Sequence, residues 1–222
     1  MTRAQKIEEK FFKLLMILAT FFIFAVLAVI IYSIFEKGLR SISWEMLTQV
    51  PQGGYYYGKG GGFLNAILGS LALALGATLL AFIIGMPVAL YLNVFLIRHK
   101  KVINVIRFLL DLIWGIPSIV YGAFGFSLMI FFGLQTSLLA GILTVTLFIL
   151  PIMIRSMDEI FRSVPMGLQE AAYSLGSNKS EIAFKIFTRQ SISGIITAVL
   201  LSFGRGIGDA AAVLFTAGYT DH

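Results

Sequence analysis

Two charged side chains lie within an otherwise apolar stretch near the end of the sequence. Arg205 and Asp209 are four residues apart in residues 200–215. A guanidinium stays ionised and offers paired, planar donors that suit an oxyanion, and a carboxylate one helical turn away can balance its charge. On a helix both groups would share one face, so the pattern indicates either a weak anion site or an ion pair that fixes helix register.

The composition is that of an integral membrane chain. Of 222 residues, 58% are hydrophobic and 13% are charged, and the mean hydropathy is +0.91. A helix of about 17 to 25 apolar residues crosses a hydrocarbon core about 30 Å thick. Runs of this kind occupy residues 14–35, 63–97, 108–132, 138–154 and 192–217. We expect an all-α, polytopic bundle of transmembrane helices with five spans.

Most lysines and arginines lie before the first span, between the second and third spans, and between the fourth and fifth. These segments share one side of the membrane, and basic residues near spans are retained on the cytoplasmic side. They form three groups: Arg3, Lys6, Lys10 and Lys13; Arg98, Lys100, Lys101 and Arg107; and Arg155, Arg162, Lys179, Lys185 and Arg189. The opposite side has Lys37, Arg40 and Lys59. We expect a multi-pass protein with a cytoplasmic N-terminus, surrounded by membrane lipid. The net charge of +6 is explained by this topology, so we expect no nucleic-acid partner.

The segment between the fourth and fifth spans has the pattern of two short helices. Pro165 can start the first, "PMGLQEAAYSL", and Gly176 can end it in a left-handed conformation. Asn178, followed three residues later by Glu181, is a capping-box pattern for the second, "SEIAFKIFTRQ". Small residues on the first helix suit docking against another protein. A solvated amphipathic loop would have the same pattern.

"EAAYSLGSNKSEIAFKIFTRQSISGI" resembles the EAA loop of ABC importer membrane subunits. Five positions match that motif in register: Glu170, Ala171, Ala172, Gly176 and Ile186. Thr188 and Arg189 replace the Leu-Pro that usually closes the motif. The resemblance implies that Glu170, Ala171, Ala172 and Gly176 couple this chain to a cytoplasmic ATPase, which hydrolyses the ATP.

Further stretches resemble the PstA-like subunits of phosphate-specific importers. They are "GGFLNAILGSL", "GMPVALYL", "DLIWGIPSIVYGAFG", "LPIMIRSMDEI" and "RGIGDAAAVLFTAG". The resemblance implies a type I ABC importer permease fold, with residues 1–62 as an anchor helix and outer loop. It implies a permease core in residues 63–222, with the coupling loop in residues 157–190. The family's sixth span is absent, so we expect a truncated chain.

The same resemblance implies a membrane-spanning subunit that carries phosphate through a prokaryotic inner membrane. It implies a PstC-like permease subunit, a cytoplasmic ABC ATPase dimer and an external phosphate-binding protein as partners. Arg205, Asp209 and Arg155 are the expected residues of the substrate path. Asp209 stands where the family has glutamate, and Arg155 would equally suit a cytoplasmic anchor.

The sequence also bears on two rival functions. A permease for another oxyanion, such as sulfate or molybdate, would have the same EAA loop. An intramembrane hydrolase would need a nucleophile with a base or a metal cluster, and neither histidine has such neighbours in sequence. Residues 53–60 have the G-x-x-x-x-G-K spacing of a phosphate loop but place Gly60 where magnesium binding needs Ser or Thr. We expect no catalytic residue, cofactor or metal.

Overall fold

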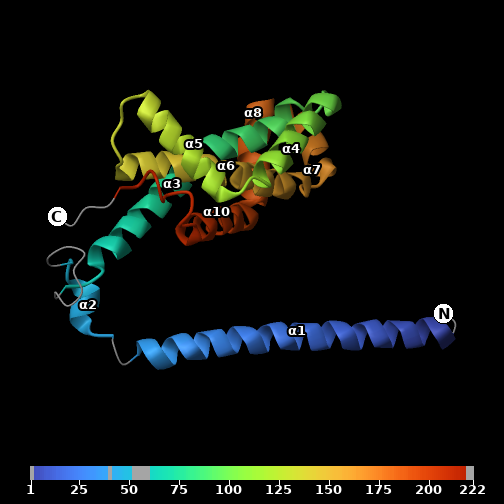
Figure 1. Ribbon diagram of the computed structural model, residues 1–222. Coiled ribbons are helices and arrows are strands. Elements are labelled where there is room, and N and C mark those ends of the chain that lie inside the picture. The colour runs from blue at the N-terminus through green and yellow to red at the C-terminus, as the bar shows by residue number, and fades with distance from the viewer. Residues whose placement is uncertain (1–2, 40–41, 52–60, 219–222) are drawn as a thin grey trace. The chain divides into compact units, whose positions relative to one another are not determined.

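The computed structural model describes residues 3–39, 42–51 and 61–218, which are helical and contain no strand (Figure 1). The expected all-α fold is therefore confirmed. The chain divides into two units, residues 1–64 and 65–222. Residues 53–60 and Arg40, which entered the sequence analysis, lie outside the described residues.

The first unit contains the longest helix, α1 (Arg3–Gly38), and the short α2 (Trp44–Thr48). The apolar side chains of α1 are exposed along its length, as a helix in contact with lipid requires. Ser43 caps α2 by accepting a hydrogen bond from the backbone N–H of Met46. The backbone N–H of Phe63, in the same unit, donates to the carbonyl of Met46 at 2.8 Å.

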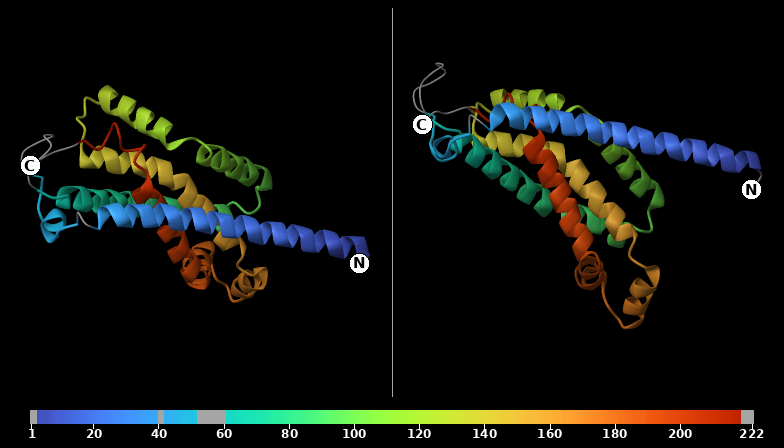
Figure 2. Two further views of the ribbon diagram at one scale, coloured as in Figure 1. Left: turned by 60° about the horizontal axis from the view of Figure 1, so that its bottom comes forward. Right: turned by 90° about the horizontal axis from the view of Figure 1, so that it is seen from below.

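The second unit is a bundle of helices around α6. Its elements are α3 (Leu64–Leu90), the π-helical η1 (Tyr91–Phe95), α4 (Lys100–Trp114), α5 (Ser118–Phe131), α6 (Leu138–Arg162), α7 (Met166–Ser174), α8 (Lys179–Glu181), the π-helical η2 (Ile182–Phe187), α9 (Thr188–Gln190) and α10 (Ile192–Gly208). α6 packs against α4, α5, α10 and η1 (Figure 2). Its inner face contributes Phe148, Met153 and Phe161 to the core, so α6 positions the other helices.

α3 lies close to α6 along a strip of small residues. Ala77, Ala81, Gly85 and Ala89 recur at every fourth position, and all four are buried. A Cβ added at Gly85 would be 3.1 Å from Cγ of Met153, closer than side chains normally pack. The strip of small residues therefore leaves room for side chains of α6 such as Met153.

The third apolar run, residues 108–132, is bent rather than straight. α4 and α5 meet at 95° across Gly115–Pro117. Pro117 has no N–H to continue the helix of α4 and disfavours a helical conformation at Ile116. The hydroxyl of Tyr121 donates to the carbonyl of Ile113 at 2.8 Å, which ties the two helices together across the bend.

The fifth run also differs from its expected extent. α10 ends at Gly208 rather than near Ala217, and residues 211–216 form turns. Three glycines in the last turns of α10 weaken the helix. The chain then reaches the start of α6, where the N–H of Ser137 donates to the carbonyl of Thr216 at 3.1 Å.

Three helices in the described part of the chain are long and apolar enough to cross a membrane: Gln5–Gly38, Leu64–Phe95 and Leu138–Arg162. The number reaches the expected five if two bent pairs each count as one span. These pairs are α4 with α5, and Lys179–Gln190 with α10, which meet at 76°.

Candidate functional site

Arg205 lies on an exposed face of α10, near its C-terminal end. Its guanidinium carbon is 5.3 Å from the centre of the Phe148 ring on α6. This cation–π contact orients the side chain without neutralising its charge. Among the described residues no carboxylate is within ion-pair distance of Arg205, so the charge remains available to an incoming anion.

The expected pairing of Arg205 with Asp209 on one helical face is wrong. Asp209 follows the last residue of α10 and has extended backbone angles, φ −98° and ψ 105°. Its Oδ1 accepts a hydrogen bond from the N–H of Ala212 at 3.0 Å. Aspartate commonly caps a following turn in this way. The carboxylate therefore shapes the turn after α10 rather than balancing the guanidinium one turn away.

The face of α10 beside Arg205 is open within this chain. Nothing lies within 4 Å of a Cβ added at Gly204 or Gly208, whereas one added at Gly206 would lie 3.4 Å from Val145 of α6. Gly204 and Gly208 therefore point away from the chain's own core. Ala212, four residues after Gly208, is buried beyond the end of the helix.

Arg155 lies on α6 and joins two carboxylates. Its Nε donates to Oδ1 of Asp111 on α4 at 2.7 Å, and its Nη1 donates to Oδ2 of Asp158 at 3.0 Å. The Asp111 side chain is 47% exposed, whereas that of Asp158 is fully buried. One partner of Arg155 is therefore accessible to solvent and the other belongs to the core.

Asp158 is the centre of a polar network that the sequence analysis did not identify. Arg107 of α4 makes two bonds to it, Nε to Oδ2 and Nη2 to Oδ1, both 2.7 Å long. Asn93 of η1 donates from Nδ2 to Oδ1 of Asp158 at 2.8 Å and to the carbonyl of Ala89 at 2.9 Å. With the bond from Arg155, the carboxylate accepts four hydrogen bonds, which compensate for its burial.

One sequence signal could have found this network. Asp158 lies on the α6 face that contributes Met153, Met157 and Phe161 to the core. An ionisable residue on the apolar face of a span must be paired or functional.

In the described residues, no group of three His, Asp or Glu is close enough to hold a metal ion.

Four of the residues matching the EAA motif lie on α7 or in the turn that ends it, and the fifth, Ile186, lies in η2. Glu170 and Ala171 are exposed, whereas Ala172 is part of the hydrophobic core and is not available for docking. Gly176 has φ +81°. The N–H of Gly176 donates to the carbonyl of Tyr173, and the N–H of Ser177 to that of Ala172, both at 3.0 Å. This is the Schellman pattern expected at a glycine stop.

The second short helix begins with the expected capping box. Oδ1 of Asn178 accepts from the N–H of Glu181 at 2.9 Å, and the Glu181 carboxylate accepts from the N–H of Asn178 at 3.1 Å. Lys185 donates to Glu181 at 2.9 Å. This bond, followed by the one from Asn178, lowers the pKa of the Glu181 carboxyl below its ordinary value. The interaction therefore favours folding above the ordinary pKa and is lost as the pH falls through the lowered one.

The comparisons with known proteins agree with this arrangement. Residues 81–221 match the family described as "Binding-protein-dependent transport system inner membrane component". The phosphate transport system permease protein PstA of Pasteurella multocida is 34% identical over 213 residues, which cover 96% of this chain and 75% of that protein. The chain is a PstA-like member of this permease family.

Other relatives extend the comparison. PstA of Yersinia pestis is 34% identical over 84% of this PstA-like chain and 62% of its own length. PstA of Mycobacterium leprae is 39% identical over 72% of this chain and 52% of its own length. The chain thus spans from about half to three quarters of these curated relatives. Its relatives are named as transport permeases rather than enzymes.

The fold has a counterpart among solved structures. An inward-facing form of the MetNI methionine ABC transporter matches with a TM-score of 0.65 at 22% identity, covering 70% of this PstA-like chain and 75% of that one. At this identity the likeness establishes the fold, a type I ABC importer permease. Inner-membrane components of this family work with an ATPase and a substrate-binding protein.

α7, the residue that follows it and η2 carry exposed apolar side chains. Leu168, Tyr173, Leu175 and Phe184 are all exposed, Leu175 by 87%. Exposed apolar side chains on short helices are candidates for contact with another protein.

Proposed function

We propose that this chain is the membrane-spanning permease subunit of an ATP-driven phosphate importer. The observation that carries the proposal is its 34% identity to a PstA phosphate permease along 96% of the chain. The exposed, unpaired guanidinium of Arg205 supports the same function, because it offers fixed charge and planar donors to an oxyanion.

In this proposal Arg205 contacts the anion in transit. Its aromatic neighbour Phe148 is buried and holds the guanidinium by a contact that does not compete for its hydrogen-bond donors. Asp209 lies just after the helix that carries Arg205, where its charge weakens anion binding at longer range. Weak binding lets the anion leave as well as enter.

Arg155 forms a second anion-binding site in the same path. Its bond to Asp158 positions the guanidinium, and the exposed Asp111 accepts a hydrogen bond from Nε. A phosphate oxyanion can displace the Asp111 carboxylate, because Asp111 is the exposed partner of this pair and water competes for it. We therefore propose that Asp111 pairs with Arg155 when no anion is bound there.

The open face of α10 fits a PstC-like permease subunit as the partner. Gly204 and Gly208 leave room for another helix beside Arg205. A path between two subunits would thus have Arg205 at its wall. An external phosphate-binding protein delivers the anion on the opposite side of the membrane from the ATPase.

The coupling surface for the cytoplasmic ATPase dimer comprises Glu170, Ala171, the Gly176 turn and the exposed apolar residues around them. Buried Ala172 supports α7 from within. This loop lies on the same side as the other basic segments, so the N-terminus is cytoplasmic in a prokaryotic inner membrane.

Substrate competition tests this function. The chain, assembled with its partner subunits in proteoliposomes, should take up radiolabelled phosphate in an ATP-dependent manner. Excess unlabelled phosphate should suppress that uptake, whereas sulfate and molybdate should leave it unchanged. Uptake of sulfate or molybdate in preference to phosphate would contradict the proposal.

A further inference from the structure

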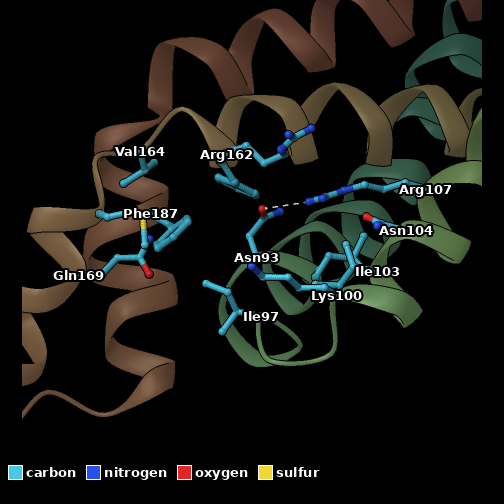
Figure 3. A pocket seen from close by; sticks show the side chains of 13 residues that line it. Asn93, Ile97, Lys100, Ile103, Asn104, Arg107, Arg162, Val164, Gln169 and Phe187 are labelled. Carbon is cyan, nitrogen blue, oxygen red and sulfur yellow. Dashed lines mark hydrogen bonds between the residues drawn. The ribbon is translucent and has the colours of Figure 1, made fainter.

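A cavity of about 320 Å³ separates the coupling helices from the corner between α3 and α4 (Figure 3). One wall carries Asn93, Ile97, Lys100, Ile103, Asn104 and Arg107, and the facing wall carries Arg162, Val164, Gln169 and Phe187 (Figure 3). The cavity is distinct from the site at Arg205, which is not among its lining residues. Its occupant would contact both the spans and the coupling helix α7.

The cavity is basic. Lys100, Arg107 and Arg162 line it, and none of its thirteen lining residues, all within the described chain, is acidic. Arg107 is already neutralised by Asp158. Lys100 and Arg162 make no ion pair with any described residue, so two positive charges remain uncompensated. Lys100 is also the first residue of α4, where the helix dipole adds partial positive charge.

Part of the cavity lining is apolar. Leu92, Ile103, Phe161 and Phe187 belong to it and are themselves almost fully buried. A small inorganic anion would leave this apolar surface uncovered. An anion with a hydrocarbon part can contact both the basic residues and the apolar lining. Basic pockets between helices at the cytoplasmic side of a membrane suit lipid headgroups.

We propose that this cavity binds the phosphate headgroup of an acidic phospholipid. Lys100 and Arg162 hold the headgroup, and the glycerol backbone and upper acyl chain lie against Leu92, Ile103 and Phe187. The bound lipid fills the joint between the α3–α4 corner and α7. The cavity lining includes neither Arg205 nor Arg155, and lipid binding there does not require phosphate transport.

A single cysteine tests the site, because the sequence has none of its own. Asn104→Cys places a thiol on the cavity wall of the complete transporter in nanodiscs. Maleimide labelling of this thiol should be slower in nanodiscs that contain phosphatidylglycerol than in those of phosphatidylcholine alone. Ser180→Cys, exposed on α8 and outside the cavity, should label equally in both lipids.

Charge variants identify the residues responsible. Lys100→Gln with Arg162→Gln should raise the phosphatidylglycerol content needed for half-protection by about 30-fold, given the usual contribution of two basic residues. Arg98→Gln with Lys101→Gln removes the same charge from exposed residues outside the cavity and should retain protection. The proposal would be overturned if the two double variants lost protection from maleimide equally. It would also be overturned if phosphatidylglycerol gave no protection to Asn104→Cys without further substitutions.

Inorganic phosphate provides the other arm of the experiment. Added to phosphatidylcholine nanodiscs, it should not slow the labelling of Asn104→Cys. Protection by inorganic phosphate that disappears with Lys100→Gln and Arg162→Gln would show that the anion comes from solution, and would overturn the lipid assignment. These measurements involve no transport, so their failure is distinguishable from failure of the proposed function.

Discussion

Arg107 and Asp158 face each other in a two-point contact between α4 and α6. Nε and Nη2 of the arginine donate to the two carboxylate oxygens, both at 2.7 Å. The Asp158 side chain has no solvent exposure, so the pair depends on complete hydrogen bonding for its stability. The added bonds from Asn93 and Arg155 join η1, α4 and α6 at one end of the bundle.

Asp158→Asn should destabilise the assembled permease by about 3 to 5 kcal/mol, because it leaves Arg107 and Arg155 without their shared buried carboxylate. Thermal unfolding of the purified complex measures the loss. Glu159→Gln is the matched control, since Glu159 is the next residue and is exposed. Equal melting temperatures for the two variants would contradict the structural role of Asp158.

Asp111→Asn should cost less than about 1 kcal/mol in stability, because the Asp111 side chain is 47% exposed. Its effect should appear in transport instead, as a change in the phosphate concentration that half-saturates uptake. A loss of stability as large as that of Asp158→Asn would make Asp111 a structural partner of Arg155 rather than a displaceable one.

Gly176→Ala should weaken the coupling loop. The φ of +81° at this residue costs a residue with a Cβ about 1 to 2 kcal/mol, so the turn after α7 would relax to another conformation. Gly167→Ala on the same helix adds a Cβ into open space without a positive φ. Co-purification with the ATPase should fall for Gly176→Ala only. Unchanged association in both variants would remove Gly176 from the docking surface.

Gly125→Ala should separate α5 from α6, because the added Cβ would overlap the Thr144 side chain. Overpacking of this kind costs about 1 to 3 kcal/mol, measured by thermal unfolding. Gly69→Ala, which meets nothing within 4 Å, should be neutral. Adding Thr144→Ala should rescue Gly125→Ala. If Thr144→Ala did not restore stability, the Gly125–Thr144 contact would not be what limits the packing of α5 on α6.

The sequence contains the local features of the fold. Hydropathy locates the spans, the Asn178–Glu181 spacing predicts the capping box, and Gly176 predicts the end of α7; the structure confirms the helices and both caps. Each of these depends on residues within one or two turns. Local patterns are therefore sufficient for them.

The remaining features depend on contacts distant in sequence. Asp158 is 51 residues from Arg107 and 65 from Asn93, and hydropathy contains no information on such pairing. The bend at Pro117 and the end of α10 at Gly208 fall within continuous apolar runs, where hydropathy alone does not locate a break. Asp209 differs from expectation because its side chain caps a turn instead of pairing along a helix.

Phosphate uptake by the Arg205→Gln variant tests the central claim most directly. The assembled transporter in proteoliposomes should retain its subunits and ATPase but lose ATP-driven phosphate uptake, because glutamine keeps hydrogen-bonding capacity without the charge. Arg189→Gln removes an exposed arginine from α9 and should transport normally. Phosphate uptake by Arg205→Gln at the rate of the unmodified transporter would contradict the assignment of Arg205 to the substrate path.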